Sequence, residues 1–125
     1  MCIRDRPKPT DAGTLGLAPE VWSSDPAQAA ARKSDPLVHD SISRHALELL
    51  PGAAKGVVER AAQVTAPTLI LHGSDDKLAP IEAVRGLVGG KIELREIAGS
   101  GHDLLHDSKA SEVRAAILEF LGRLV

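Results

Sequence analysis

A short apolar run that ends at a glycine and two aspartates constrains the fold of this chain more than any other stretch. The run covers residues 68–71, is bounded by Pro67 and Gly73, and is followed by Asp75 and Asp76. Such a run is typical of a strand buried on both faces, as in a parallel sheet covered by helices. Because ligand and catalytic groups of these sheets lie just past the carboxyl ends of the strands, the two aspartates occupy a position suited to function.

A second strand is predicted downstream of the first. Residues 80–88 carry apolar side chains at a helical spacing, and residues 91–97 begin with an alternation typical of a half-exposed strand near a sheet edge. Such a β-α-β unit has a right-handed crossover, so both strands point the same way. The aspartate loop and the loop that carries His102 then emerge at one edge. Neighbouring strands lie about 4.8 Å apart, so we expect a carboxylate and an imidazole within hydrogen-bonding distance.

Further helices are predicted on both sides of this unit. Apolar spacing and capping signals place them at residues 26–33, 41–50, 54–63 and 108–124, the first capped by Ser24 or Asp25. Pro51 and Gly52 are predicted to separate the second helix from the third, and residues 7–26 are interpreted as a loop. A stable sheet normally needs three or more strands. We therefore expect the partner strands to lie outside this chain.

Composition and charge exclude several classes of protein. The 125 residues are enough for one small domain, and 43% hydrophobic with 26% charged residues is typical of a globular protein. A net charge of −2 and a pI near 6.2 argue against nucleic-acid and membrane-surface partners. No apolar run approaches the ~20 residues that cross a bilayer. Cys2 is the only cysteine, which excludes an internal disulfide and leads us to expect a cytoplasmic protein.

The first six residues have a different expected origin from the rest. One back-translation of Met-Cys-Ile-Arg-Asp-Arg resembles the end of a transposase sequencing adapter. Residues 1–6 are therefore interpreted as a library scar outside the fold. This interpretation also predicts that the reading frame was cut arbitrarily.

Three motifs give the chain a resemblance to a known family. They are Pro-Thr-Leu-Ile-Leu-His-Gly-Ser-Asp-Asp at residues 67–76, Gly-Ser-Gly-His-Asp-Leu-Leu at residues 99–105, and Ser-Asp-Pro-Leu-Val at residues 34–38. With the C-terminal helix, they resemble the end of an α/β-hydrolase of the monoacylglycerol lipase and lysophospholipase branch (serine aminopeptidase, or S33-type, hydrolases). The resemblance implies an α/β fold class, with the end of a cap region and connecting helices in residues 7–63. Residues 64–125 would then hold the last two parallel strands and their helices.

The resemblance also implies roles for single residues. In that family a G-S-x-D segment supplies the acid of a catalytic triad and a G-x-x-H segment supplies the base. Carried over, Asp76 is the acid and His102 is the base, with Asp75 at the variable position. The resemblance further implies no cofactor, and a lipid-like ester such as an acylglycerol or a lysophospholipid as the substrate.

The nucleophile of such a triad is missing from this chain. α/β-Hydrolases carry the triad in the order Ser, Asp or Glu, His, with the serine on a G-x-S-x-G elbow, and the sequence contains no such elbow. We therefore expect a C-terminal piece of a serine hydrolase that is inactive alone. The alternative is a non-catalytic α/β binding module or a pseudoenzyme.

Other histidines suggest competing sites. His102-Asp103-Leu104-Leu105-His106 resembles the H-E-x-x-H helix of zinc proteases. The flanking glycines favour a loop at His102, so no metal site is predicted, and His106 is assigned a supporting or structural role. The remaining histidines are predicted to be packed (His72) or surface residues (His39 and His45).

Overall fold

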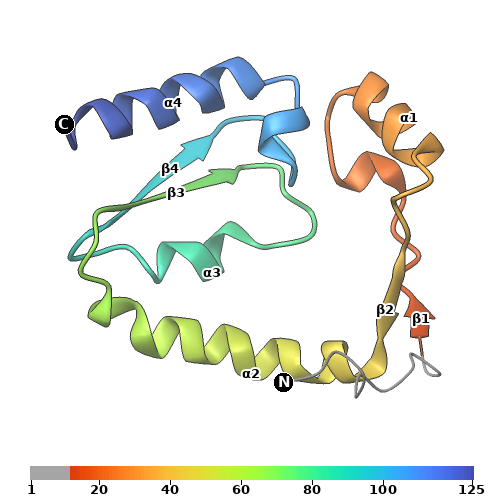
Figure 1. The fold of residues 1–125 in the computed structure, drawn as a ribbon, viewed down its shortest axis with the longest axis horizontal. Helices are drawn as coiled ribbons and strands as arrows, with labels where there is room; N and C mark the ends of the chain where they lie inside the picture. The colour runs from red at the N-terminus through yellow and green to blue at the C-terminus, as the bar shows by residue number, and fades with distance from the viewer. Residues whose placement is uncertain (1–11) are drawn as a thin grey trace, which may run out of the picture.

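The structure, a computed structural model, describes residues 12–125. These residues form four helices and four strands. The interpretation of residues 1–6 as a scar lies outside this range. In chain order the elements are β1 (Ala12–Thr14), α1 (Pro26–Ser34), β2 (Ser41–Ser43), α2 (Arg44–Arg60), β3 (Thr68–Gly73), α3 (Ile81–Arg85), β4 (Ile92–Ile97) and α4 (Ala110–Gly122) (Figure 1). Short 3₁₀ helices occur at Pro19–Val21, Ala61–Gln63 and Leu104–His106.

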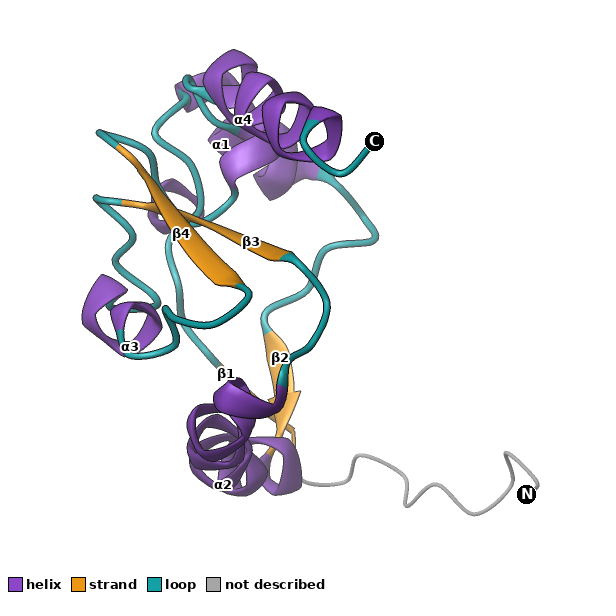
Figure 2. Cartoon of the chain, turned by 90° about the vertical axis from the view of Figure 1, so that its left-hand side faces the viewer, coloured by secondary structure: helices purple, strands orange, loops and turns teal. Residues whose placement is uncertain are grey.

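The β3–β4 pair is the predicted β-α-β unit. Its strands run parallel, with Thr68 opposite Ile92 and Gly73 opposite Ile97. The helix α4 covers one face of the pair, and α3 lies on the other face (Figures 1 and 2). The parallel arrangement confirms that the two following loops emerge at the same edge. The helix α3 is shorter than predicted and ends at Arg85, directly before Gly86, a residue with low helix propensity.

The expectation that β3 is buried on both faces is wrong for the described residues. Residues 68–71 are only half-buried, whereas His72 and Gly73 are buried. Within residues 12–125, β4 is the only strand that pairs with β3. A strand with one neighbour leaves its other edge open, which explains the partial exposure.

The apolar core lies between β4 and α4. Its members on these two elements are Ile92, Ile97 (0% exposed), Val113 (1% exposed) and Ala116. At the rim, Arg95 of β4 forms a bidentate ion pair with Glu119 of α4, with N–O distances of 2.7 and 2.9 Å. The predicted amphipathic C-terminal helix is therefore confirmed, and it docks on the β3–β4 pair.

The N-terminal part contains an antiparallel strand pair that the sequence pattern does not predict. β1 pairs antiparallel with β2, with Gly13 opposite Ile42. The loop interpretation of residues 7–26 is therefore wrong at β1 and at the first 3₁₀ helix, because a three-residue strand carries no detectable alternation. The helix α1 begins as predicted, since the Asp25 side chain accepts a hydrogen bond from Ala27 N at 2.8 Å.

The helix α2 is continuous, so the predicted break at Pro51 is wrong. It begins at Arg44 rather than at residue 41 because Ser41–Ser43 pair with β1, and Ser43 caps it by accepting from Ala46 N at 3.1 Å. Proline removes one helical hydrogen bond. None of the residues of α2 is buried, so the carbonyl left unpaired can bind water. Neither α2 nor any other described helix is long and apolar enough to cross a membrane.

Candidate active site

The loops after β3 and β4 meet at the carboxyl edge of the pair. Gly73 makes this contact possible, because a Cβ at this position would lie 2.3 Å from the carbonyl oxygens of both Ser100 and Gly101. A backbone hydrogen bond of 3.0 Å from Asp75 N to Ser100 O joins the loops. Any side chain at residue 73 would push the two loops apart.

Asp76 and His102 form a hydrogen-bonded pair across these loops. His102 Nδ1 lies 2.8 Å from Asp76 Oδ2. The other carboxylate oxygen, Oδ1, accepts from the backbone N–H groups of Leu78 (2.8 Å) and Ala79 (3.0 Å). The side chain of Asp76 is 5% exposed, whereas that of His102 is 37% exposed. The expected contact is therefore present, with a buried carboxylate behind an accessible imidazole.

This geometry determines which nitrogen of His102 carries the proton. An ionised carboxylate only accepts hydrogen bonds, so neutral His102 has its proton on Nδ1 and a lone pair on Nε2. Burial raises the pKa of the Asp76 carboxyl, but the hydrogen bonds from Ala79, His102 and Leu78 outweigh burial and hold that pKa below its usual value. Asp76 is thus ionised at neutral pH, and His102 Nε2 can accept a proton from a third group.

The indole of Trp22 contacts the His102 ring. The two ring centroids are 5.2 Å apart and the ring planes meet at 72°, an edge-to-face arrangement. The guanidinium carbon of Arg32 lies 4.0 Å from the centroid of the Trp22 ring. The segment before α1 therefore reaches the pair from a distant part of the sequence. A single aromatic residue in a loop has no pattern that predicts such a contact.

A cavity of about 410 Å³ adjoins Trp22. Its lining combines apolar residues with charged and titratable ones: Leu15, Leu17, Pro19, Trp22, Val38, Arg32, Lys33, His39 and Asp40. A concave, mainly apolar surface with a few polar groups is typical of a small-molecule site. The cavity and the Asp76–His102 pair share Trp22 as a common neighbour.

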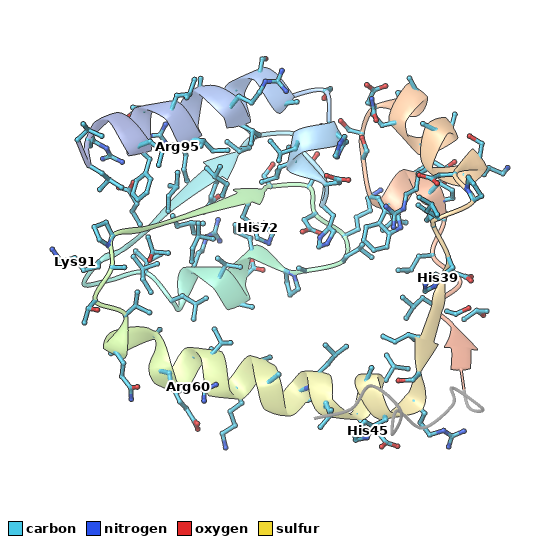
Figure 3. The ribbon with its side chains drawn as sticks, viewed as in Figure 1. His39, His45, Arg60, His72, Lys91 and Arg95 are labelled. Carbon is cyan, nitrogen blue, oxygen red and sulfur yellow. The ribbon has the colours of Figure 1, made fainter. Side chains whose placement is uncertain are left out.

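His72 is a second histidine next to Asp76. Its Nε2 lies 3.6 Å from Asp76 Oδ2, and its Nδ1 donates to the Gly73 carbonyl oxygen at 2.9 Å. Figure 3 shows His72 on the α3 side of β3, with His39 and His45 well away from it. The prediction of a packed, hydrogen-bonded histidine is confirmed.

The other candidate residues lie outside the pair. Asp75 is exposed and accepts a hydrogen bond of 2.8 Å from Ser74 Oγ. His106 Nδ1 lies 3.0 Å from Asp103 Oδ1. Because His102 is in a loop and His106 is in a 3₁₀ helix, the two do not form a zinc-protease helix. Residues 12–125 contain no group of three or more His, Cys, Asp or Glu side chains suited to a metal ion.

Asp107 is a residue of this region that sequence reasoning missed. Its carboxylate accepts hydrogen bonds from the backbone N–H groups of Ser24 and Gly101. It thereby links the segment that carries Trp22 to the loop that carries His102. In the sequence, a lone aspartate before a helix is indistinguishable from a solvated turn residue.

Known sequences match most of this chain. The family described as Serine aminopeptidase, S33, matches residues 4–109. A monoacylglycerol lipase from Mycolicibacterium smegmatis (strain ATCC 700084 / mc(2)155) is 33% identical over 96 residues, which cover 73% of this chain and 34% of that protein. The chain thus spans about a third of the length of this curated relative.

Solved structures share the same fold. The Paleococcus ferrophilus monoacylglycerol lipase superposes with a TM-score of 0.80 at 29% identity, covering 93% of this chain and 47% of that chain. A soluble variant of the Saccharomyces cerevisiae monoglyceride lipase, in complex with a substrate analogue, gives a TM-score of 0.74 at 20% identity. The match covers 94% of this chain and 45% of that chain. At the lower identity the likeness concerns the fold alone. The chain therefore has part of an α/β-hydrolase fold and spans under half of either structure.

Proposed function

Because the chain belongs to the serine aminopeptidase S33 family of α/β-hydrolases, we propose that Asp76 and His102 are the acid and the base of a Ser-His-Asp triad. The 2.8 Å hydrogen bond between His102 Nδ1 and Asp76 Oδ2 carries this proposal. The nucleophilic serine would come from a part of the hydrolase outside this chain, since the sequence has no G-x-S-x-G elbow.

In the proposed reaction the serine hydroxyl attacks the carbonyl carbon of a carboxylic ester. His102 Nε2 accepts the hydroxyl proton and returns it to the leaving alcohol, which leaves the acyl group on the serine. Water then attacks this acyl-enzyme, with His102 again moving the proton, and releases the carboxylic acid and the free serine. Asp76 holds the Nδ1–H tautomer and stabilises the imidazolium. The lowered pKa of Asp76 supports this role, because a protonated carboxyl could not stabilise a neighbouring cation.

The proposed substrate is a lipid ester with a single acyl chain, of the monoacylglycerol or lysophospholipid type. The relatives that match over most of this chain are named monoacylglycerol and monoglyceride lipases. The apolar wall of the cavity beside Trp22 supports the same substrate class, since hydrocarbon chains are bound by apolar surface.

The test of this proposal uses the longer protein from the source DNA. Sequence upstream of residue 7, taken from an independent library, is expected to encode an in-frame G-x-S-x-G elbow between a strand and a helix. The longer protein should then hydrolyse monoacylglycerol. Asp76→Asn should lower kcat by about four orders of magnitude, because an amide favours the wrong His102 tautomer. His102→Ala should have a comparable effect, because it removes the base.

Two matched controls lie in the same loops. Asp75→Asn and His106→Gln change an exposed aspartate and an exposed histidine that do not contact the pair, so both should keep nearly full activity. An Asp76→Asn protein that retains full activity would contradict the triad assignment. Absence of an elbow upstream would instead favour a non-catalytic α/β module.

A further inference from the structure

Asp107 is a buried carboxylate whose hydrogen bonds connect two distant segments. It lies between the 3₁₀ helix Leu104–His106 and α4 and is only 5% exposed. Its Oδ2 accepts from the backbone N–H groups of Ser24 (2.7 Å) and Gly101 (3.2 Å). Its Oδ1 accepts from the hydroxyl groups of Ser24 (2.7 Å) and Ser108 (3.0 Å). We call the contacts of Asp107 with Ser24 and Gly101 the Asp107 clasp.

The Asp107 clasp joins the segment of Trp22 to the loop of His102. Two further hydrogen bonds run beside it, from Asp103 N to Trp22 O and from Ser23 Oγ to His106 O, both 2.7 Å long. These bonds anchor the residues on both sides of His102 and the residues that directly follow Trp22. Hydrogen bonds of backbone groups as well as of side chains therefore hold the Trp22 ring against the His102 ring.

The segment of Trp22 and the loop of His102 approach each other closely at Gly101. A Cβ at Gly101 would lie 3.3 Å from Trp22 O and 3.4 Å from Asp107 Oδ2, so the glycine allows a close approach. Burial raises the pKa of Asp107, but the hydrogen bonds from Ser24, Gly101 and Ser108 outweigh burial and hold that pKa far below its usual value. Asp107 is therefore an acceptor throughout the neutral pH range.

We propose that Asp107 is a positioning residue that orients the His102 ring by holding Trp22 edge-on against it. The proposal rests on the assignment of His102 as the base of the triad. Asp76 holds only Nδ1, and a single hydrogen bond leaves the imidazole free to swing about it. The indole edge limits that swing, so the Asp107 clasp couples the segment that carries Trp22 to the direction in which Nε2 points.

The chain itself provides the probe for a test. Trp22 is the only tryptophan and there is no tyrosine, so the intrinsic fluorescence of the chain reports on Trp22. A protonated imidazole in ring contact quenches an indole more strongly than a neutral one, so the emission should fall as His102 takes up a proton. The charged groups around this contact are Asp76, the Arg32 guanidinium and the Asp103–His106 pair. His102→Gln should therefore abolish the titration, and His106→Gln should leave it in place.

Asp107→Asn should remove the pH-dependent quenching, because the amide group turns a donor toward the N–H or O–H groups that Asp107 now accepts from. Nitrogen NMR of the imidazoles should show His102 changing from the Nδ1–H tautomer to a mixture. Ser24→Ala should reduce the quenching in part, because one hydroxyl contact is lost while the Ser24 N–H remains. Ser34→Ala is the matched control and should titrate like the unmodified chain, because the Ser34 hydroxyl bonds only to carbonyl oxygens within α1.

A purely structural role would predict a different outcome. If Asp107→Asn and Ser24→Ala both fold and keep the full quenching and the Nδ1–H tautomer, the proposal is wrong. If Asp107→Asn fails to fold, Ser24→Ala decides, and unchanged quenching in that variant overturns the proposal. Because no substrate is used, a failure here is separate from a failure of the hydrolase assignment, which the activity of the longer protein tests.

Discussion

The two longest helices of this chain both carry apolar residues at helical spacing but bury them very differently. α4, together with β4, forms a core in which Ile97 is 0% and Val113 is 1% exposed. α2 is longer but buries none of its residues, and its Leu49 and Leu50 are 56% and 55% exposed. Figure 1 shows the reason, since α4 lies along the β3–β4 pair whereas α2 runs beyond α3.

This difference teaches that an apolar stripe determines which face a helix can bury, and not whether it is buried. Isolated helices are marginal in water, and packing of the apolar face normally supplies their stability. We therefore expect the β3–β4–α4 unit to form the cooperative core of the chain. The helix α2 should open first in native-state hydrogen exchange, because it depends on local hydrogen bonds.

The largest expected effect follows from a change at the contact between the two active-site loops. Gly73→Ala places a Cβ 2.3 Å from two carbonyl oxygens, which belong to backbone and cannot rotate away. The free energy of unfolding should fall by more than about 4 kcal/mol, an exceptional loss for one methyl group. Chemical denaturation measures it. A loss below that of an ordinary core substitution would show that the loops adapt easily.

A matched pair of substitutions compares the two regions directly. Ile97→Ala in the core should lower the free energy of unfolding by about 3 kcal/mol, through lost apolar burial and the cavity left behind. Leu50→Ala on α2 should change it by less than about 0.5 kcal/mol, as at other exposed sites. Equal losses in thermal or urea unfolding would mean that α2 packs against the rest of the chain in solution.

Acid should weaken the Asp107 clasp, which joins the segment of Trp22 to the loop of His102. Folding lowers the pKa of Asp107, so its stabilisation is present above about pH 4, the pKa of an unfolded aspartate, and is lost as the pH falls toward the lowered folded value. Asp76 shifts in the same direction. Asp107→Asn should cost about 2 kcal/mol near neutral pH.

The pH profile of unfolding separates this cause from general acid denaturation. The difference between the unmodified chain and Asp107→Asn should shrink as the pH is lowered below 4, because the protonated aspartate also loses its charge. A difference that stays constant across this range would contradict the assignment of the shifted pKa to Asp107. Asp103→Asn, which lies in the same loop, is the matched control.

The smallest expected effect concerns α2 alone. Gly52 lies in the middle of the helix with open space around its missing Cβ. Gly52→Ala should stabilise α2 by about 1 kcal/mol through helix propensity. Hydrogen exchange should slow within α2 and stay unchanged at Ile97 if the regions are independent. Slower exchange at both sites would show that they unfold together.

Local patterns were sufficient to predict the β3–α3–β4 unit and the approach of the aspartate loop to His102, whereas the choice of Asp76 over Asp75 came from the family resemblance. Strand and helix periods identify the elements, and a crossover connection makes the two strands parallel, so both following loops lie at the same edge of the pair. The same reasoning failed at Pro51, where exposure of α2 makes the lost hydrogen bond tolerable. It also failed at β1, because Ala12–Thr14 pair through backbone groups that any sequence possesses.

The sequence by itself determined that carboxylates and an imidazole follow β3 and β4 at one edge, because residue types, their spacing and the handedness of the crossover are local properties. Tertiary structure alone decided that Trp22 stands against His102 and that Asp107 accepts from Ser24. These contacts join residues far apart in the chain, and their partners are ordinary loop residues without a repeating pattern. Their free energy comes from burial and hydrogen bonding that exist only after the segments have been brought together.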